Sequence, residues 1–417
     1  MSPHPPRLTR MDGDFKRFWA GQSVSAVGTH VTAVALPLTA AITLDAGAAG
    51  VSAIATASYL PSAVLPLLAG HWLEGRRKRG LMVATDLLRA AAVAAIPLAW
   101  AFDHLSVAIL VAVALVVGAA SVLFDIASFA YLPDFVPEQE LPAANRALQG
   151  SSTAAQVGGP GLAGLLVQML GPAIALLVDA ISYVASAVGI AAARRTEAAP
   201  QSTDERPGLW EGVRQIAVSP FLRSMTVGVA LYNGAAQIMV VNLVILAVKD
   251  RGVSAGGYGI ALSAGGVGAF VGAMIVLRPA RRFGYGPALL GSITLSTGVP
   301  VALAFLPGRG LEYGVLLGLV QFGAGIGLGG ANVLSVTIRQ LLIPRTSLAR
   351  SNGAYRTFTY GVLPLGAALG GVLGSTFGPT VAVAVGTAGM AVSAVPMFVV
   401  REVRNLTTPI ALDAAGH

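Results

Sequence analysis

The sequence predicts an all-α integral membrane protein with twelve transmembrane helices in two pseudo-symmetric six-helix bundles. Three observations predict this fold: an apolar composition, apolar stretches of bilayer-spanning length, and one long polar interruption near the middle. Hydrophobic residues make up 55% of the 417 residues, 11% are charged, and the mean hydropathy is +0.73. Soluble domains are about one-quarter charged, and one helix needs about 20 apolar residues to cross a bilayer.

The apolar stretches divide evenly on the two sides of the polar interruption. The N-terminal bundle, residues 17–193, has expected spans at 17–44, 50–73, 81–101, 106–127, 147–169 and 173–193. The C-terminal bundle, residues 221–400, has expected spans at 221–248, 256–277, 286–306, 312–338, 352–374 and 380–400. We expect residues 1–16 and 401–417 to be cytoplasmic tails. Residues 194–220 are the expected cytoplasmic linker, and apolar positions from Leu209 to Ala217 recur at the spacing of a short interfacial helix.

The basic residues predict the orientation of the spans. With a cytoplasmic N-terminus, all but four of the 27 Lys and Arg residues fall on the cytoplasmic side; the exceptions are Arg89, Lys249, Arg251 and Arg309. Because cytoplasmic loops of membrane proteins carry an excess of Lys and Arg, both termini are predicted to be cytoplasmic. The net charge of +8 is therefore explained by topology and does not indicate a nucleic-acid partner.

An internal repeat relates the two bundles. Five residues in and next to span five recur in and next to span eleven at a constant offset of 207, namely Asn145, Gly159, Gly164, Gly171 and Pro172 as Asn352, Gly366, Gly371, Gly378 and Pro379. At an offset of 202, the loop residues Gly70, Arg76 and Arg79 recur as Gly272, Arg278 and Arg281. Parallel six-span repeats of this kind build a large class of transporters that bind substrate between the two halves.

The sequence also argues against several other classes of protein. There is no cysteine, and the five histidines are scattered, so we expect no metal site and no cofactor. Gly325, Gly327 and Gly330 match a dinucleotide-binding pattern but lie inside an apolar span, which indicates helix packing. No nucleotide-binding or hydrolase motif is found, so we expect a protein that is not an enzyme and is driven by an ion gradient.

The loop after span two resembles a signature of the major facilitator superfamily. It reads Gly-His-Trp-Leu-Glu-Gly-Arg-Arg-Lys-Arg over residues 70–79, with a glutamate at the acidic position and an intact basic run. The resemblance implies a cytoplasmic gate in which the acidic position faces span eleven and a loop arginine pairs with a carboxylate at the end of span four. The implied gate residues are Glu74, Arg76, Arg77, Lys78, Arg79 and Asp125.

Span five is similar to the motif found in exporters and antiporters of the superfamily. Its core is Gly159, Pro160 and Gly164, which bend the helix and let a neighbour approach closely; we expect that neighbour to be the glycine-rich span eight. Further similarity lies in short segments at Phe18–Gln22, Asp86–Arg89, Phe124–Asp125, Leu132–Pro137 and Leu176–Asp179. Taken together with the motifs above, the match covers nearly the whole chain and resembles the branch that contains siderophore exporters, such as the enterobactin exporter, and macrolide-efflux proteins.

Two ionisable residues within the spans are candidates for proton coupling. His30 lies near the middle of span one, and histidine has an ordinary pKa of about 6.5, within the range of working pH. Asp179 lies in span six without a basic residue nearby in the sequence. Each has a structural alternative: a neutral histidine bonded to a neighbouring helix, or a carboxylate that accepts hydrogen bonds from residues such as Ser182.

Other polar residues favour structural or gating roles. Asp86 and Arg89 are three residues apart and can form an ion pair on one helix face. Asp125 is close to the cytoplasmic surface, which favours the gate over proton transfer. Candidates for lining a substrate cavity, each of which could instead bond neighbouring helices or pack in the core, are Gln22, Thr29, Tyr59, Gln156, Tyr232, Asn233, Gln237, Gln321 and Asn332.

Together these features predict a secondary active transporter in the bacterial inner membrane. The resemblance implies export of a small amphipathic organic molecule, such as a drug, antibiotic or siderophore-like compound, by proton antiport and alternating access. The expected partners are the small-molecule substrate, the proton gradient and the lipid bilayer, with the protein acting as a monomer. A proton-coupled importer and a non-transporting membrane receptor or scaffold are the alternatives.

Overall fold

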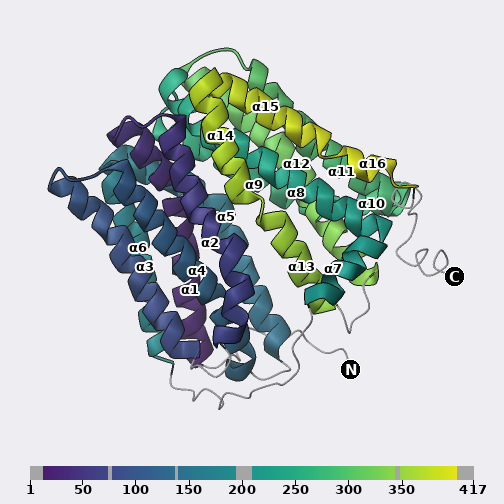
Figure 1. Ribbon diagram of the computed structural model, residues 1–417, viewed down its shortest axis with the longest axis horizontal. Helices are drawn as coiled ribbons and strands as arrows, with labels where there is room; N and C mark the ends of the chain where they lie inside the picture. The colour runs from purple at the N-terminus through teal and green to yellow at the C-terminus, as the bar shows by residue number, and fades with distance from the viewer. Residues whose placement is uncertain (1–12, 74–77, 137–139, 194–208, 343–347, 402–417) are drawn as a thin grey trace. The chain divides into compact units, whose positions relative to one another are not determined.

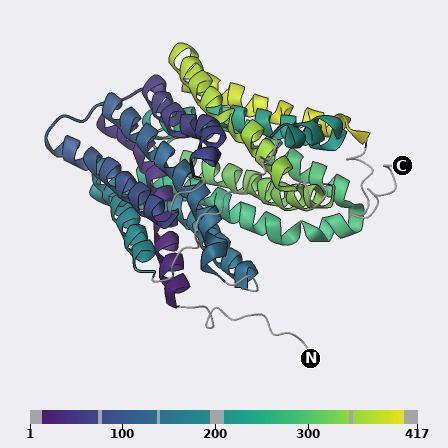
Figure 2. The same ribbon diagram turned by 60° about the horizontal axis from the view of Figure 1, so that its bottom comes forward.

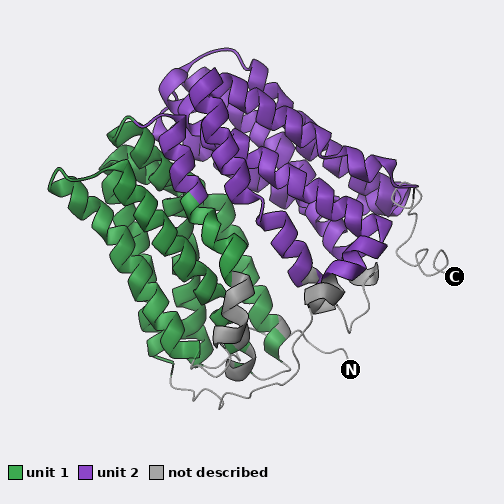
Figure 3. Ribbon diagram, in the orientation of Figure 1, with its two compact units in different colours: residues 1–45, 57–204 green, residues 46–56, 205–417 purple. Residues whose placement is uncertain are grey.

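The computed structural model describes residues 13–73, 78–136, 140–193, 209–342 and 348–401. Throughout these ranges every regular element is a helix, in agreement with the predicted all-α class. Residues 1–45 and 57–204 form one compact unit, unit 1, and residues 46–56 and 205–417 form a second, unit 2 (Figure 3). The beginning of the second span, up to residue 56, groups with unit 2.

The first six predicted spans are all helices (Figure 1). They are α1 (Gly13–Leu38) with the π-helical turn η2 (Thr39–Thr43), α2 (Ala48–Leu73), α3 (Lys78–Ala101), α4 (Val107–Phe135), α5 (Leu141–Leu170) and α6 (Pro172–Ala191). The regular α-helix of span one gives way to the π-helical turn just after Pro37, whose missing N–H removes one helical hydrogen bond. Ser106 caps α4, because its hydroxyl accepts the Ile109 N–H.

The remaining six spans are also helical, but several are interrupted. They are α8 (Pro220–Val244) with the π-helical turn η4 (Ile245–Asp250), α9 (Ala255–Ile275), α11 (Tyr285–Gly298) with the 3-10 segment η5 (Val299–Phe305), α12 (Gly310–Leu342), α13 (Leu348–Tyr360) continued by α14 (Leu363–Phe377), and α15 (Pro379–Val392) with α16 (Val395–Val399). The predicted linker helix is present as α7 (Leu209–Val218), and a short helix that was not predicted, α10 (Leu277–Phe283), joins α9 to α11.

Eleven helical segments in the described residues are long and apolar enough to cross a membrane. The other predicted span corresponds to α5, a 30-residue helix whose first half carries Asn145, Arg146 and Gln149. Many large apolar side chains on the helices are exposed, for example Ile181 at 67% and Leu319 at 63%. Exposed apolar surface on long helices is the surface that lipid covers in a multi-pass membrane protein.

Helix contacts repeat between the two units. In unit 1, α1 packs against α5 and α6, and α3 packs against α4 and α6. In unit 2, α8 packs against α14 and α15, and α11 packs against α12 and α15. Seen from a second direction, the helices of each unit still lie side by side (Figure 2). The internal repeat of the sequence is therefore a repeat of helix pairings.

Two glycines at the repeat offset of 207 adopt the same conformation. Gly171, between α5 and α6, has φ 83° and ψ 157°, and Gly378, between α14 and α15, has φ 85° and ψ 158°. A positive φ of this size is available to glycine without strain. Each is followed by a proline at the first helical position, Pro172 and Pro379, where no N–H is needed. The same short turn therefore reverses the chain in both units.

The glycines of α9 pack against α12 within unit 2. A Cβ atom added at Gly268 or Gly272 would collide with the backbone carbonyl of Phe322 or Ile326, and one added at Gly325 would collide with the Gly265 carbonyl. Gly325 and Gly327 thus form a helix-packing surface inside α12, as the sequence indicated, with Gly327 against α11. The predicted contact between spans five and eight joins the two units and stays a prediction.

Candidate functional site

The described part of the chain has three charged side chains that are almost fully buried, and all three lie in unit 1. Asp86 and Asp179 are 0% exposed and Arg89 is 5% exposed. Asp86 and Arg89 are on α3, and Asp179 is on α6, which packs against α3. Because a buried charge is costly unless it is paired, this charged cluster (Asp86, Arg89 and Asp179) is the first candidate for a functional site.

The predicted pair on α3 is an ion pair. The Arg89 guanidinium donates to Asp86 Oδ1. The second carboxylate oxygen, Asp86 Oδ2, accepts the hydroxyl of Ser186 on α6 at 2.6 Å. Gln22 of α1 donates its amide to the oxygen of the same Ser186 at 2.8 Å. One polar chain therefore runs from α1 through α6 to the ion pair on α3.

The Arg89 guanidinium lies between two aromatic rings. Its central carbon is 4.4 Å from the ring centroid of Phe124 on α4 and 4.4 Å from that of Tyr183 on α6. Cation–π contacts stabilise a desolvated cation, and Ser121 adds a distant acceptor at 3.4 Å. The Arg89 Nε atom is buried and has no hydrogen-bond partner among the described residues. The cation is thus held mainly by Asp86 and by ring faces.

Asp179 lies against α1 at a position where α1 has no side chain. Its Oδ1 atom accepts the Ser182 hydroxyl at 3.0 Å, which is the bond that the structural alternative predicted. A Cβ atom added at Gly28 of α1 would collide with Ser182 and Asp179, so the carboxyl group fits only because residue 28 is glycine. Within the described residues, Asp179 Oδ2 is buried and has no hydrogen-bond partner, and the same is true of Thr32 Oγ1 on α1.

The second proton-coupling candidate, His30, is next to the exporter-type motif. His30 is half-buried on α1, and a Cβ atom added at Gly159 of α5 would collide with the His30 Cβ atom. The histidine and the exporter-type motif were predicted separately. They are in contact where α1 packs on α5, through His30 and Gly159. Thr29, beside His30, is exposed, and its hydroxyl is 3.3 Å from the hydroxyl of Tyr183.

The predicted gate residues are only partly described. Glu74, Arg76 and Arg77 lie outside the described residues. Arg79 donates to the carbonyl oxygens of Ile190, at 3.2 Å, and Ala191 at the end of α6, where a cation also complements the helix dipole. Asp125 is exposed on α4, and the gate remains a prediction.

The predicted cavity residues are distributed over both units. In unit 1, Gln22 belongs to the polar chain described above, Tyr59 is half-buried, and Gln156 is exposed. In unit 2, Asn233 donates to the Thr359 carbonyl at 2.7 Å and therefore bonds neighbouring helices. The other candidates in unit 2 range from buried to exposed: Gln237 is buried, Tyr232 and Gln321 are half-buried, and Asn332 is exposed.

The sequence missed residues that complete the charged cluster. Gly28, Ser186 and Tyr183 were not predicted, because a glycine, a serine and a tyrosine in apolar spans carry no distinctive pattern. A usable signal was the spacing of Asp179, Ser182 and Ser186 along span six, which places them on one helix face. Among the described residues, no three His, Asp or Glu side chains lie close enough together to hold a metal ion.

Comparison with known proteins supports a transport role. The family model described as "Transmembrane secretion effector" matches residues 9–409. The chain is 27% identical over 370 residues to the multidrug efflux pump Tap of Mycolicibacterium fortuitum, covering 85% of this chain and 87% of that protein. It is also 27% identical over 301 residues to Tap of Mycobacterium tuberculosis, covering 68% and 70% of the two chains.

Solved structures show the same fold. An inward-facing bacterial homologue of the iron transporter ferroportin has a TM-score of 0.76 at 18% identity, over 94% of this chain and 99% of that chain. A point mutant of the nucleoside transporter NupG has a TM-score of 0.74 at 13% identity, over 93% and 99%. Helix order, repeated helix pairings and the match over almost the whole length lead to one assignment: this chain belongs to the transmembrane secretion effector family of the major facilitator superfamily, an efflux branch of multi-pass membrane transporters.

Proposed function

We propose that this protein exports a small amphipathic organic molecule from a bacterial cell by proton antiport. The similarity to Tap multidrug efflux pumps over 85% of the chain supports the direction and the substrate class. The charged cluster buried in unit 1 supports coupling to protons, and it is the observation that carries the proposal. In this proposal the two units alternate between access to the cytoplasm and access to the outside.

The charge count of the cluster suggests how one proton would be bound. With Asp86 and Arg89 paired, an ionised Asp179 would leave one uncompensated negative charge in a buried place. One proton on Asp179 would make the cluster neutral, and the unpartnered Oδ2 atom is an available place for it. Thr32 faces the same carboxyl group, and its hydroxyl can accept from the protonated form or donate to the ionised form.

Release of that proton would need a change in the surroundings of Asp179. Arg89 is the nearby cation, and an arrangement in which Arg89 moves closer to Asp179 while water reaches the cluster would stabilise the ionised form. Because Arg89 is on α3 and Asp179 is on α6, a shift of α3 against α6 would change the distance between Arg89 and Asp179. A shift between two such arrangements would couple proton release to the conformational cycle.

His30 is the second proposed proton site. It is half-buried and packs against Gly159, so a movement at the bend of α5 would change its exposure. Histidine gains and loses a proton near neutral pH. Asp179 is the stronger candidate for the proton site, because its carboxyl group is completely buried and its Oδ2 atom has no hydrogen-bond partner among the described residues.

The remaining parts of the proposal follow from the sequence. The basic residues support an inner-membrane protein with both termini in the cytoplasm. The loop from Glu74 to Arg79, with Asp125, would close the cytoplasmic side, and Gly159, Pro160 and Gly164 would limit proton leak. The substrate would bind between the two units, and we propose that the transporter works as a monomer without catalytic activity of its own.

Inverted membrane vesicles provide the test of direction and substrate. Vesicles with and without the protein would be given a panel of lipophilic antibiotics and siderophores, with and without an imposed pH gradient. The proposal predicts accumulation of at least one compound that depends on both the protein and the gradient. Accumulation only in right-side-out vesicles would favour the importer, and no accumulation in either would favour the receptor or scaffold.

A further inference from the structure

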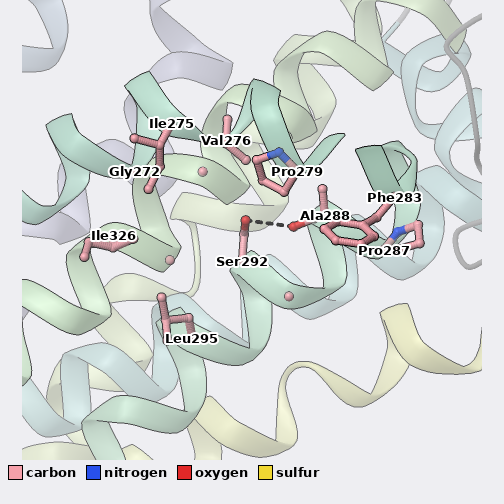
Figure 4. Close-up of a pocket in the computed structure, with 13 residues that line it drawn as sticks. Gly272, Ile275, Val276, Pro279, Phe283, Pro287, Ala288, Ser292, Leu295 and Ile326 are labelled. Carbon is pink, nitrogen blue, oxygen red and sulfur yellow. Dashed lines mark hydrogen bonds between the residues drawn. The ribbon is translucent and has the colours of Figure 1, made fainter. Parts of the chain in front are cut away.

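Unit 2 has an apolar cavity where α9, α10, α11 and α12 meet (Figure 4). Its volume is about 310 Å³, near the lower limit of the roughly 300–1,000 Å³ typical of ligand pockets. Among the side chains that line it only Ser292 is polar, and its hydroxyl already donates to the Ala288 carbonyl at 2.8 Å. The lining side chains therefore leave no hydrogen-bond donor free for a polar ligand, and the cavity suits a hydrocarbon chain.

The cavity opens at the surface of unit 2. Three of the side chains around it are substantially exposed: Ile275 at 42%, Phe283 at 61% and Leu295 at 38%. Exposed apolar side chains on membrane helices contact acyl chains. A lipid chain can therefore enter this groove from the bilayer without passing through the protein.

Three cations lie on the short helix that forms one wall of the cavity. Arg278, Arg281 and Arg282 of α10 are all exposed, and within the described ranges none of them forms a salt bridge. The Arg282 guanidinium lies 5.2 Å from the ring centroid of Phe283, and Phe283 lines the cavity. The helix α10 thus carries positive charge without a counter-ion among the described residues, and it forms one wall of an apolar groove.

The repeat explains why this space is empty in unit 2. At the offset of 202 residues, Asp86 and Arg89 of unit 1 correspond to Ala288 and Gly291 of unit 2, and both of these line the cavity. Unit 1 fills the equivalent position with an ion pair. In unit 2, a Cβ atom added at Gly291 would meet no atom within 4 Å, so the groove continues past this residue.

We propose that this groove binds an anionic phospholipid, with one acyl chain in the cavity and the phosphate on Arg278, Arg281 and Arg282. Apolar lining and unpaired cations together match the two parts of such a lipid, and basic pockets between membrane helices bind anionic headgroups in this way. In the orientation of the proposed function, the lipid would come from the cytoplasmic leaflet; binding itself does not depend on that orientation.

Native mass spectrometry of the purified full-length protein tests the proposal. The protein would be titrated with phosphatidylglycerol and, separately, with phosphatidylcholine of the same acyl chains. The wild type should bind phosphatidylglycerol preferentially. Gly291→Leu should fill the groove and weaken binding of phosphatidylglycerol by about tenfold or more. The matched control is Gly298→Leu, which adds the same side chain to α11 at another exposed glycine with open space around it and outside the lining.

The headgroup contact has its own variant. Arg278→Gln/Arg281→Gln/Arg282→Gln should abolish the preference for phosphatidylglycerol, because each cation near a membrane surface contributes to attraction of anionic lipid. Arg214→Gln/Arg223→Gln removes two other exposed arginines and should keep the preference. These substitutions are on exposed residues and remain informative if Gly291→Leu gives little folded protein.

Three results would overturn the proposal. The first is equal binding of the two lipids by the wild type. The second is binding of phosphatidylglycerol by Gly291→Leu at the wild-type level. The third is a full preference for phosphatidylglycerol in the triple arginine variant. Loss of phosphatidylglycerol binding in Gly298→Leu as well as in Gly291→Leu would also count against the groove, because it would show a general effect of leucine on α11.

Discussion

Units 1 and 2 have the same helix pairings, but only unit 1 buries charge in its described residues. At the repeat offset of 207, Asp179 and Ser182 of α6 correspond to Gly386 and Gly389 of α15. Gly386 packs closely on the backbone of α8, where an added Cβ atom would lie 2.7 Å from the Met239 nitrogen. In one unit the position holds a carboxyl group, and in the other it holds no side chain.

Unit 2 shows that these helix pairings can form without a charged cluster buried among its described residues. Unit 2 forms the equivalent helix pairs with glycines and small neutral residues, which let helices approach closely in a membrane. Buried ion pairs often contribute little net stability compared with apolar packing. We therefore propose a functional role for Asp86, Arg89 and Asp179, and the predictions below compare changes in the two units.

The largest effect is expected from Arg89→Leu. This change leaves Asp86 and Asp179 buried without a cation, and breaking a buried pair from one side costs about 3–5 kcal/mol. Denaturant unfolding of the purified protein would measure it. Arg214→Leu, at an exposed arginine of unit 2, should change the free energy of unfolding by less than about 0.5 kcal/mol. Equal losses in both variants would contradict the assignment of a special role to the cluster.

Gly28→Ala is expected to have the next largest effect. The added methyl group would press on Ser182 and Asp179, and overpacking of this kind costs about 1–3 kcal/mol. Gradient-driven transport should fall together with stability, because the carboxyl group must move. Gly158→Ala, where an added Cβ atom meets nothing within 4 Å, is the control in the same unit; unchanged transport in Gly28→Ala would argue against the location of the proton site.

A smaller and more selective effect is expected where α5 crosses α1. Gly159→Ala would collide with the His30 Cβ atom, whereas Gly366→Ala in unit 2 would collide with the backbone of Gly234. We expect each change to destabilise the protein by about 1–2 kcal/mol. Adding His30→Gly should recover much of the loss from Gly159→Ala, since the obstructing atom is removed. Failure of that rescue in thermal unfolding would indicate that the crossing is not the cause.

Thr29→Val should have the smallest effect. It removes a hydroxyl 3.3 Å from the Tyr183 hydroxyl, and side-chain hydrogen bonds between membrane helices contribute about 0.6 kcal/mol on average. We expect a small change in thermal stability and a modest change in transport. A complete loss of transport would instead show that Thr29 contacts the substrate, as its exposure would allow.

Most of the fold could be predicted from the sequence, because apolar length and basic loops are strong signals in a membrane protein. All twelve predicted spans are helical in the structure, and the linker helix α7 was also predicted. The helix α10 was missed because it has only seven residues, includes three arginines and a proline, and ends before Gly284. A short basic segment of this kind has the composition of a loop between two spans. The break between α13 and α14 was also missed, although Gly361 and Pro364 mark it.

Much less of the candidate site could be predicted. The ion pair of Asp86 and Arg89 and the bond from Ser182 to Asp179 followed from helical spacing. The links between helices did not: Ser186 to Asp86 and the two rings around Arg89 depend on how α1, α3, α4 and α6 pack. The contact between Gly28 and the carboxyl group of Asp179 could not be predicted either, because a single glycine in an apolar span does not indicate which side chain packs against it.

The most direct test of the central claim compares two modes of transport in proteoliposomes containing Asp179→Asn. A substrate identified in the vesicle assay would be followed first by exchange at equal pH on both sides and then by accumulation driven by a pH gradient. Since asparagine cannot bind and release the proton, the account predicts exchange within about twofold of wild type and loss of gradient-driven accumulation. Wild-type accumulation in Asp179→Asn would contradict it.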